Sequence, residues 1–151
     1  MLDLLIIGAG PAGIMAAYEA KQAGLDYLVL EKGLIGNTIY QYPVGLTVFS
    51  TTNELEFNDS GLQPAREKPT REELLSYYVR FVLDNELNVR TEEKVLTLQK
   101  TRLGFRITSD KGVYDSRTVL FAVGAMDHPR KLNVPGEDLP KVHDHFRETY
   151  P

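Results

Sequence analysis

The chain has 151 residues, a length that fits one domain and is too short for two dinucleotide-binding domains. Its 42% of hydrophobic and 25% of charged residues exclude a disordered or fibrous protein. The net charge of −4 predicts neither a nucleic-acid nor a membrane partner. No apolar run approaches the about 18 residues of a membrane span, which indicates a cytoplasmic protein. Without cysteine, the chain has no disulfide and no thiolate metal site.

The first 31 residues predict a β-α-β unit. Residues 3–7 form an apolar run that ends in glycine, as in a strand that is buried on both faces of a parallel sheet. A helix is expected to begin at Pro11 and to end near Gly24, since glycine suits a left-handed C-terminal cap. Residues 27–31 then predict a second buried strand.

Residues 32–69 are rich in Gly, Asn, Thr, Ser and Pro and predict a long, mostly irregular segment. Loops of this length are usually functional. Within it, Ser50, Thr51 and Thr52 suit two roles equally well, as hydrogen-bond partners of a ribityl chain or as the start of a turn.

A second helix is predicted from Thr70 to about Asn85. Thr70 and Glu73 have the spacing of a capping box, and apolar residues recur at helical intervals after them. Its aromatic residues are predicted to belong to the core rather than to a stacking platform for bases; they are Tyr77, Tyr78 and Phe81.

The hydrophobic period changes after this helix. Residues 87–90 predict a brief strand, and a period of two then predicts an antiparallel three-stranded meander over residues 94–100, 105–109 and 112–116. Residues 118–123 return to the continuous apolar pattern of a buried strand, which stops at Gly124. The proline-containing remainder predicts loop and turn, with a short helix near residues 143–149.

The sequence Gly-Ala-Gly-Pro-Ala-Gly lies between the first predicted strand and helix, and this context makes the G-x-G-x-x-G pattern specific. Gly8 permits the tight turn, Gly10 leaves the backbone open to a pyrophosphate, and Gly13 lets the helix pack closely against the strand. Free N–H groups and the helix dipole would hold the phosphates. The motif's candidate cofactor-binding residues are Gly8, Gly10, Pro11, Ala12 and Gly13.

Glu31 closes the second predicted strand, 18 residues beyond Gly13. A carboxylate there accepts hydrogen bonds from the ribose hydroxyls of an adenosine and repels a 2′-phosphate. The sequence therefore predicts a site for FAD or NAD rather than NADP. The alternative is a glycine-rich turn that serves packing alone.

The order of the elements favours FAD. A simple NAD-binding domain would continue with further βα units, whereas here an irregular segment, a helix and a meander precede the next buried strand. The chain thus resembles the N-terminal part of two-dinucleotide-domain flavoproteins of the glutathione reductase and thioredoxin reductase type, and within them the bacillithiol-disulfide-reductase-like group. The resemblance is carried by residues 31–33, 38–43, 47–52, 120–124 and 134–142.

The resemblance implies an α/β fold: a Rossmann-like parallel sheet with an inserted antiparallel three-stranded meander. It implies that residues 1–151 are an FAD/NAD(P)-binding domain, truncated before a pyridine-nucleotide domain and lacking the C-terminal segment that closes the FAD site. In the full-length enzymes, hydride passes from NAD(P)H to the flavin and then to a small acceptor, such as a low-molecular-weight disulfide. NAD(P)H would be the donor only with the second domain, so we expect the 151 residues alone to be inactive.

The resemblance also extends the candidate site. It places the backbone of Val95 at the adenine and residues 40–50 near the flavin, and residues 122–124 resemble the family's second FAD motif. Relatives often carry a cysteine at the position of Ala12, so the resemblance identifies no catalytic residue here. The cofactor-binding candidates that it adds are Lys32, Tyr40, Val95, Ala122 and Gly124.

Two other functions stay open. The chain can be an isolated dinucleotide-binding module without turnover, or the N-terminal part of a flavin monooxygenase, which shares the opening motif. Truncation would leave the strand that ends near Gly124 as a bare sheet edge, which predicts a homodimer. The histidines are predicted to be surface or turn residues; they are His128, His143 and His145. Four glutamates are predicted to lie on solvated faces or to cap helices; they are Glu72, Glu73, Glu92 and Glu93.

Overall fold

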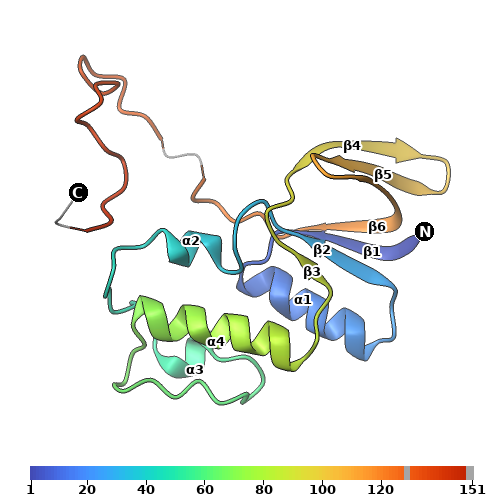
Figure 1. The fold of residues 1–151 in the computed structure, drawn as a ribbon, viewed down its shortest axis with the longest axis horizontal. Coiled ribbons are helices and arrows are strands. Elements are labelled where there is room, and N and C mark those ends of the chain that lie inside the picture. Colours follow the sequence, from blue (N-terminus) through green and yellow to red (C-terminus); the bar gives the residue numbers. More distant parts are fainter. Residues whose placement is uncertain (128–129, 149–151) are drawn as a thin grey trace.

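The computed structural model describes residues 1–127 and 130–148 and contains a six-stranded sheet in the order β3-β2-β1-β6-β5-β4 (Figure 1). Strands β3, β2, β1 and β6 are parallel, and β6, β5 and β4 are antiparallel, so the predicted α/β fold with a Rossmann-like sheet is confirmed. The elements are β1 (Leu2–Ile7), α1 (Pro11–Gln22), β2 (Tyr27–Leu30), α2 (Asn37–Tyr40), α3 (Thr52–Leu55), α4 (Arg71–Asp84), β3 (Val89–Arg90), β4 (Val95–Thr101), β5 (Gly104–Ser109) and β6 (Val113–Phe121).

The two faces of the parallel strands are covered by different elements. Helices α1 and α4 lie side by side on one face (Figure 1). Between these helices, the ring centroids of Tyr18 and Phe81 are 5.4 Å apart. On the other face, Ile107 of the β4–β5 hairpin packs against Leu5 and Leu28. Strands β1 and β2 are therefore buried on both sides, as their continuous apolar runs predict.

One long strand, β6, replaces the two strands predicted at 112–116 and 118–123. It pairs with β5 up to Ser116 and with β1 from Ser116 onwards. The break predicted near Arg117 was wrong. The Arg117 side chain points to solvent and forms an ion pair with Asp3 at 3.1 Å, so the strand accommodates this charge without a turn. The strand is also interior to the sheet, and the predicted bare edge was wrong: within the described chain, the edges are β3 and β4.

The end of β6 is also less buried than its apolar sequence predicts. Leu120 and Phe121 are 38% and 64% exposed. Helix α1 packs against β1 and β2, and this leaves the side chains at the end of β6 open.

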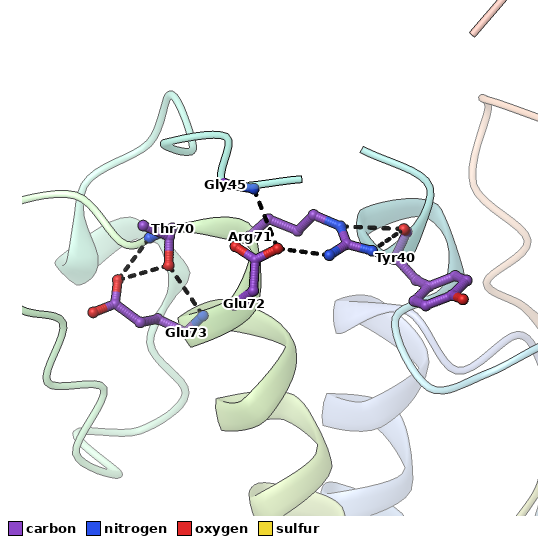
Figure 2. Close-up of polar contacts among 6 residues, drawn as sticks. All are labelled: Tyr40, Gly45, Thr70, Arg71, Glu72 and Glu73. Carbon is purple, nitrogen blue, oxygen red and sulfur yellow. Dashed lines mark hydrogen bonds and ion pairs between the residues drawn. The ribbon is translucent and has the colours of Figure 1, made fainter. Parts of the chain in front are cut away.

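Helix α4 begins and ends as predicted. The N–H of Glu73 donates to Thr70 Oγ1 at 3.2 Å, and the Glu73 carboxylate accepts from the N–H of Thr70 at 2.8 Å, which confirms the capping box (Figure 2). The residue after the last turn is Asn85. The aromatic residues of α4 are buried as predicted. None of the helices in the described ranges is long and apolar enough to cross a membrane.

We expect Thr70→Ala to lower the free energy of unfolding by about 1 kcal/mol, because it removes the hydroxyl that accepts the first-turn N–H. Urea denaturation followed by circular dichroism measures the change. Ser76→Ala is the matched control, since it removes an exposed hydroxyl from the middle of the same helix. Equal midpoints for the two variants would contradict a stabilising cap.

Apart from α1 and α4, the described segments outside the sheet are largely irregular. Residues 32–69 contain only the single-turn helices α2 and α3. The short helix predicted at 143–149 is absent from residues 143–148, and its last residue lies outside the described ranges. The carbonyl of Arg147 is not used in a helix; it accepts a hydrogen bond from the N–H of Val44, in the segment after α2, at 2.9 Å. His143 and His145 are exposed, and His128 lies outside the described residues.

Candidate functional site

A cleft of about 870 Å³ lies at the carboxyl ends of β1, β2 and β6. Parallel sheets bind ligands at this edge, where the loops that leave neighbouring strands diverge. The glycine motif, the irregular segment and the start of β4 all contribute to it. Its lining includes residues 10–12, 31–32, 37–39, 48–50, 93–95 and 121–127.

The three glycines of the motif differ in what a side chain would meet. At Gly8, where φ is +108°, a Cβ atom would lie 2.4 Å from the Ala122 carbonyl oxygen. At Gly13 it would lie 1.9 Å from the carbonyl oxygen of Gly8. A Cβ atom at Gly10 would meet no heavy atom within 4 Å. Two of the glycines are therefore required by the fold, whereas Gly10 keeps a space open in the cleft.

That open space lies at the N terminus of α1. The N-cap residue is Gly10, and no described side chain caps this end. The first-turn N–H groups of Ala12 and Gly13 have no partner within the helix, and Pro11 has no N–H. The first turn also contains no acidic residue. The arrangement suits an anion, because N–H groups and the helix dipole face the cleft and no carboxylate of the first turn competes for them.

Glu31 lies at the end of β2 and is 7% exposed. Its Oε2 accepts from the N–H of Ala9 and its Oε1 from the N–H of Gly33, both at 2.8 Å. These bonds fix the carboxylate between the glycine motif and the loop after β2. A carboxylate has about four acceptor positions, so both oxygens keep capacity for a ligand in the cleft.

The candidates on the other strands also line the cleft. Ala122 follows β6, and its N–H donates to the carbonyl of Ile7 at 2.8 Å. Gly124 has a φ of +67° and open space around it. Val95 borders the cleft where β4 begins. The segment after β6 is connected to the end of β2, because Lys32 forms an ion pair with Asp127.

Tyr40 is not among the residues that line the cleft. The guanidinium carbons of Arg71 and Arg147 lie over its ring, 5.2 and 5.0 Å from the ring centroid. Arg71 donates twice to the carbonyl of Tyr40, at 2.6 and 3.2 Å, and to Glu72 at 2.6 Å (Figure 2). Arg71 thereby holds the end of α2, whose residues 37–39 line the cleft.

Residues 50–52 do not all have the same one of the two predicted roles. Ser50 lines the cleft. Thr51 donates to the Glu54 carboxylate at the start of α3, and Thr52 donates to the Glu67 carbonyl at 3.0 Å. The two threonines therefore stabilise the turn, whereas Ser50 is available to a ligand.

The far half of the cleft, between α2 and α4, is largely apolar. Ile39, Val48 and Leu74 line it together with Tyr78. Burial, aided by the neighbouring Tyr77, raises the pKa of Tyr78 to about 12, so its hydroxyl stays neutral. Tyr78 was predicted as core, and it is core, but its position also makes it a wall of the cleft.

Glu93 was predicted as a solvated residue, and this was wrong: it is 3% exposed and lines the cleft. Its Oε1 accepts from Ser109 Oγ and from the hydroxyl of Tyr114, both at 2.6 Å. Burial raises the pKa of Glu93, but these bonds, together with the charges of Arg90 and Lys111, hold it below its ordinary value. Glu93 is therefore a buried, ionised carboxylate at the site.

Comparisons with known proteins agree with this geometry. Residues 5–151 match the family model described as pyridine nucleotide-disulphide oxidoreductase. Bacilliredoxin reductase Bdr of Bacillus subtilis is 42% identical over 148 residues, which cover 97% of this chain and 46% of that protein. The structure of bacillithiol disulfide reductase Bdr from Staphylococcus aureus superposes with a TM-score of 0.95 at 39% identity, over 99% of this chain and 46% of that one.

A more distant structure is a complex with two dinucleotides. The crystal structure of OTEMO in complex with FAD and NADP superposes with a TM-score of 0.78 at 25% identity, over 91% of this chain and 28% of that one. The chain spans about half the length of the two Bdr proteins.

Proposed function

Because the chain belongs to the pyridine nucleotide-disulphide oxidoreductase family, we propose that its cleft binds FAD and that it is the FAD-binding part of an NAD(P)H-dependent flavin oxidoreductase. The observation that carries this proposal is the open space at Gly10, in front of an uncapped helix N terminus and in the same cleft as Glu31. A pyrophosphate fits the first feature and an adenosine ribose the second.

The adenosine diphosphate half of FAD would lie across the carboxyl ends of β1 and β2. The N–H groups of Ala12 and Gly13 would donate to the pyrophosphate, and Gly10 lets it approach the backbone. Glu31 would accept from the ribose hydroxyls. The adenine would reach the backbone of Val95, at the start of β4.

The flavin half would then extend toward α2 and the end of β6. Ser50 and residues 37–39 of α2 line that part of the cleft, and its apolar wall can exclude water from one side of a ring system. The open backbone at Gly124 would allow close approach. Bound FAD supplies the capacity to accept and pass on a hydride, while these residues bind and orient it.

A small disulfide is our proposed class of electron acceptor, because two relatives near 40% identity are described as a bacilliredoxin reductase and a bacillithiol disulfide reductase. These 151 residues contain no cysteine, so the thiols for an exchange reaction would have to come from outside them. A monooxygenase has weaker support, since the structure of cyclohexanone monooxygenase superposes with a TM-score of only 0.78 at 26% identity.

We expect the chain to bind FAD at least about tenfold more tightly than FMN, because FMN lacks the second phosphate and the adenosine that the pyrophosphate and Glu31 sites would hold. Titration of each flavin, followed by fluorescence anisotropy, gives the two dissociation constants. ADP should compete with FAD, since it occupies the same half of the cleft. Equal affinities for FAD and FMN, or no binding of either, would contradict the proposal.

A further inference from the structure

The two oxygens of the buried Glu93 carboxylate have unequal surroundings. Ser109 and Tyr114 both donate to Oε1, whereas none of the residues that the structure describes donates to Oε2. In the same residues, no side-chain nitrogen or oxygen atom is both sealed from solvent and without a hydrogen-bond partner. Oε2 is therefore reachable from outside, and the space that Glu93 borders is the cleft.

The carboxylate is held in a fixed orientation. Two donors on Oε1 restrain rotation of the group, and Arg90 in turn donates to the Tyr114 hydroxyl at 2.8 Å. Burying a carboxylate is unfavourable unless its acceptor positions are used. The protein satisfies one oxygen fully and leaves the other, which can only accept, for a donor that enters the cleft.

The position of Glu93 matches one part of the nucleotide. Its N–H donates to the carbonyl of Glu31 at 2.8 Å, so Glu93 is adjacent to the proposed ribose site. Val95, the proposed backbone contact of the base, is two residues further along. A base attached to a ribose at Glu31 would thus lie beside Glu93.

We propose that Glu93 is a specificity-determining residue of this site, whose Oε2 accepts a hydrogen bond from the 6-amino group of adenine. The inference rests on the proposed function and adds to it a reason for selecting adenine. An acceptor-only oxygen favours an amino group and disfavours a carbonyl at the same position, so the site discriminates against a 6-oxopurine such as hypoxanthine.

Calorimetric titration of the chain with ADP and IDP tests this selectivity without any substitution. We expect ADP to bind about tenfold or more tightly than IDP, the effect of exchanging a charge-assisted hydrogen bond for a repulsive contact. Equal affinities would overturn the role of Glu93. If neither ADP nor FAD binds, the proposed function itself fails, so the two failures are distinguishable.

A variant then isolates the contribution of Glu93, since hypoxanthine differs from adenine at N1 as well. Glu93→Gln keeps the shape of the side chain and presents a donor as well as an acceptor, so the ratio of the ADP and IDP affinities should fall about tenfold. The loss of a negative charge affects both ligands alike and cancels in this ratio. Glu92→Gln, at the exposed neighbour, should leave the ratio unchanged. Retained selectivity in Glu93→Gln would overturn the proposal.

Discussion

Replacing Gly10 with valine is expected to weaken the binding of FAD and ADP by at least about 100-fold while leaving the chain folded. Gly10 has φ −78° and ψ −178°, an extended conformation that suits a β-branched residue. A Cβ atom there meets no other atom within 4 Å. The valine side chain is therefore accommodated in the free protein, and it occupies the space where the pyrophosphate would approach the backbone.

The size of the effect follows from the contacts that are lost. The two hydrogen bonds from the N–H groups of Ala12 and Gly13 to a charged phosphate contribute about 1.5–3 kcal/mol each, and 1.4 kcal/mol corresponds to about tenfold in affinity. Gln22→Val is the matched control, because it introduces the same side chain at an exposed position at the other end of α1. Full affinity in Gly10→Val would place the phosphates elsewhere.

The parts of the fold that the sequence predicts well are those that depend on consecutive residues. The β-α-β unit is visible because β1 and β2 are buried on both faces and Gly24 ends α1 with a φ of +69°. The cap of α4 is predictable for the same reason, since Thr70 and Glu73 satisfy each other's backbone within one turn.

Strand β6 was mispredicted because its surroundings change along its length. Its first half pairs with β5 and contains the polar residues Asp115 and Ser116, whereas its second half pairs with β1 and ends in the apolar run of residues 119–121. Two patterns suggested two strands. The backbone nevertheless continues through Ser116, which is fully buried and pairs with both neighbours.

The buried charges of the site were not predictable from sequence patterns. Glu93 is buried by Ser109 and Tyr114, 16 and 21 residues away, and Arg71 by the carbonyl of Tyr40, 31 residues away. Locally, Glu93 belongs to a pair of acids and Arg71 follows a helix cap, positions that are usually exposed. Only the folded chain brings their partners together.

Replacing Gly13 with alanine is expected to lower the free energy of unfolding by about 3 kcal/mol or more. In most helices this change would stabilise by about 1 kcal/mol, because alanine favours the helix. Here the new Cβ would lie 1.9 Å from the carbonyl oxygen of Gly8 and 3.0 Å from its carbon, both backbone atoms of the turn after β1. The helix must move away from the strand, and this loosens the contacts of Ile14 and Ala17, which are fully buried.

Gly24→Ala is the control for this variant. Gly24 has a φ of +69° but open space around it. Alanine there lowers the free energy of unfolding only by the cost of its left-handed conformation, about 1–2 kcal/mol. Urea denaturation of both variants separates steric overlap from backbone strain, and equal losses would mean that α1 does not pack closely on β1. Because a shift of α1 also displaces the N–H groups of its first turn, Gly13→Ala should lose nucleotide affinity together with stability. Gly10→Val should lose affinity alone, and this difference separates the residue that contacts the ligand from the one that positions the helix.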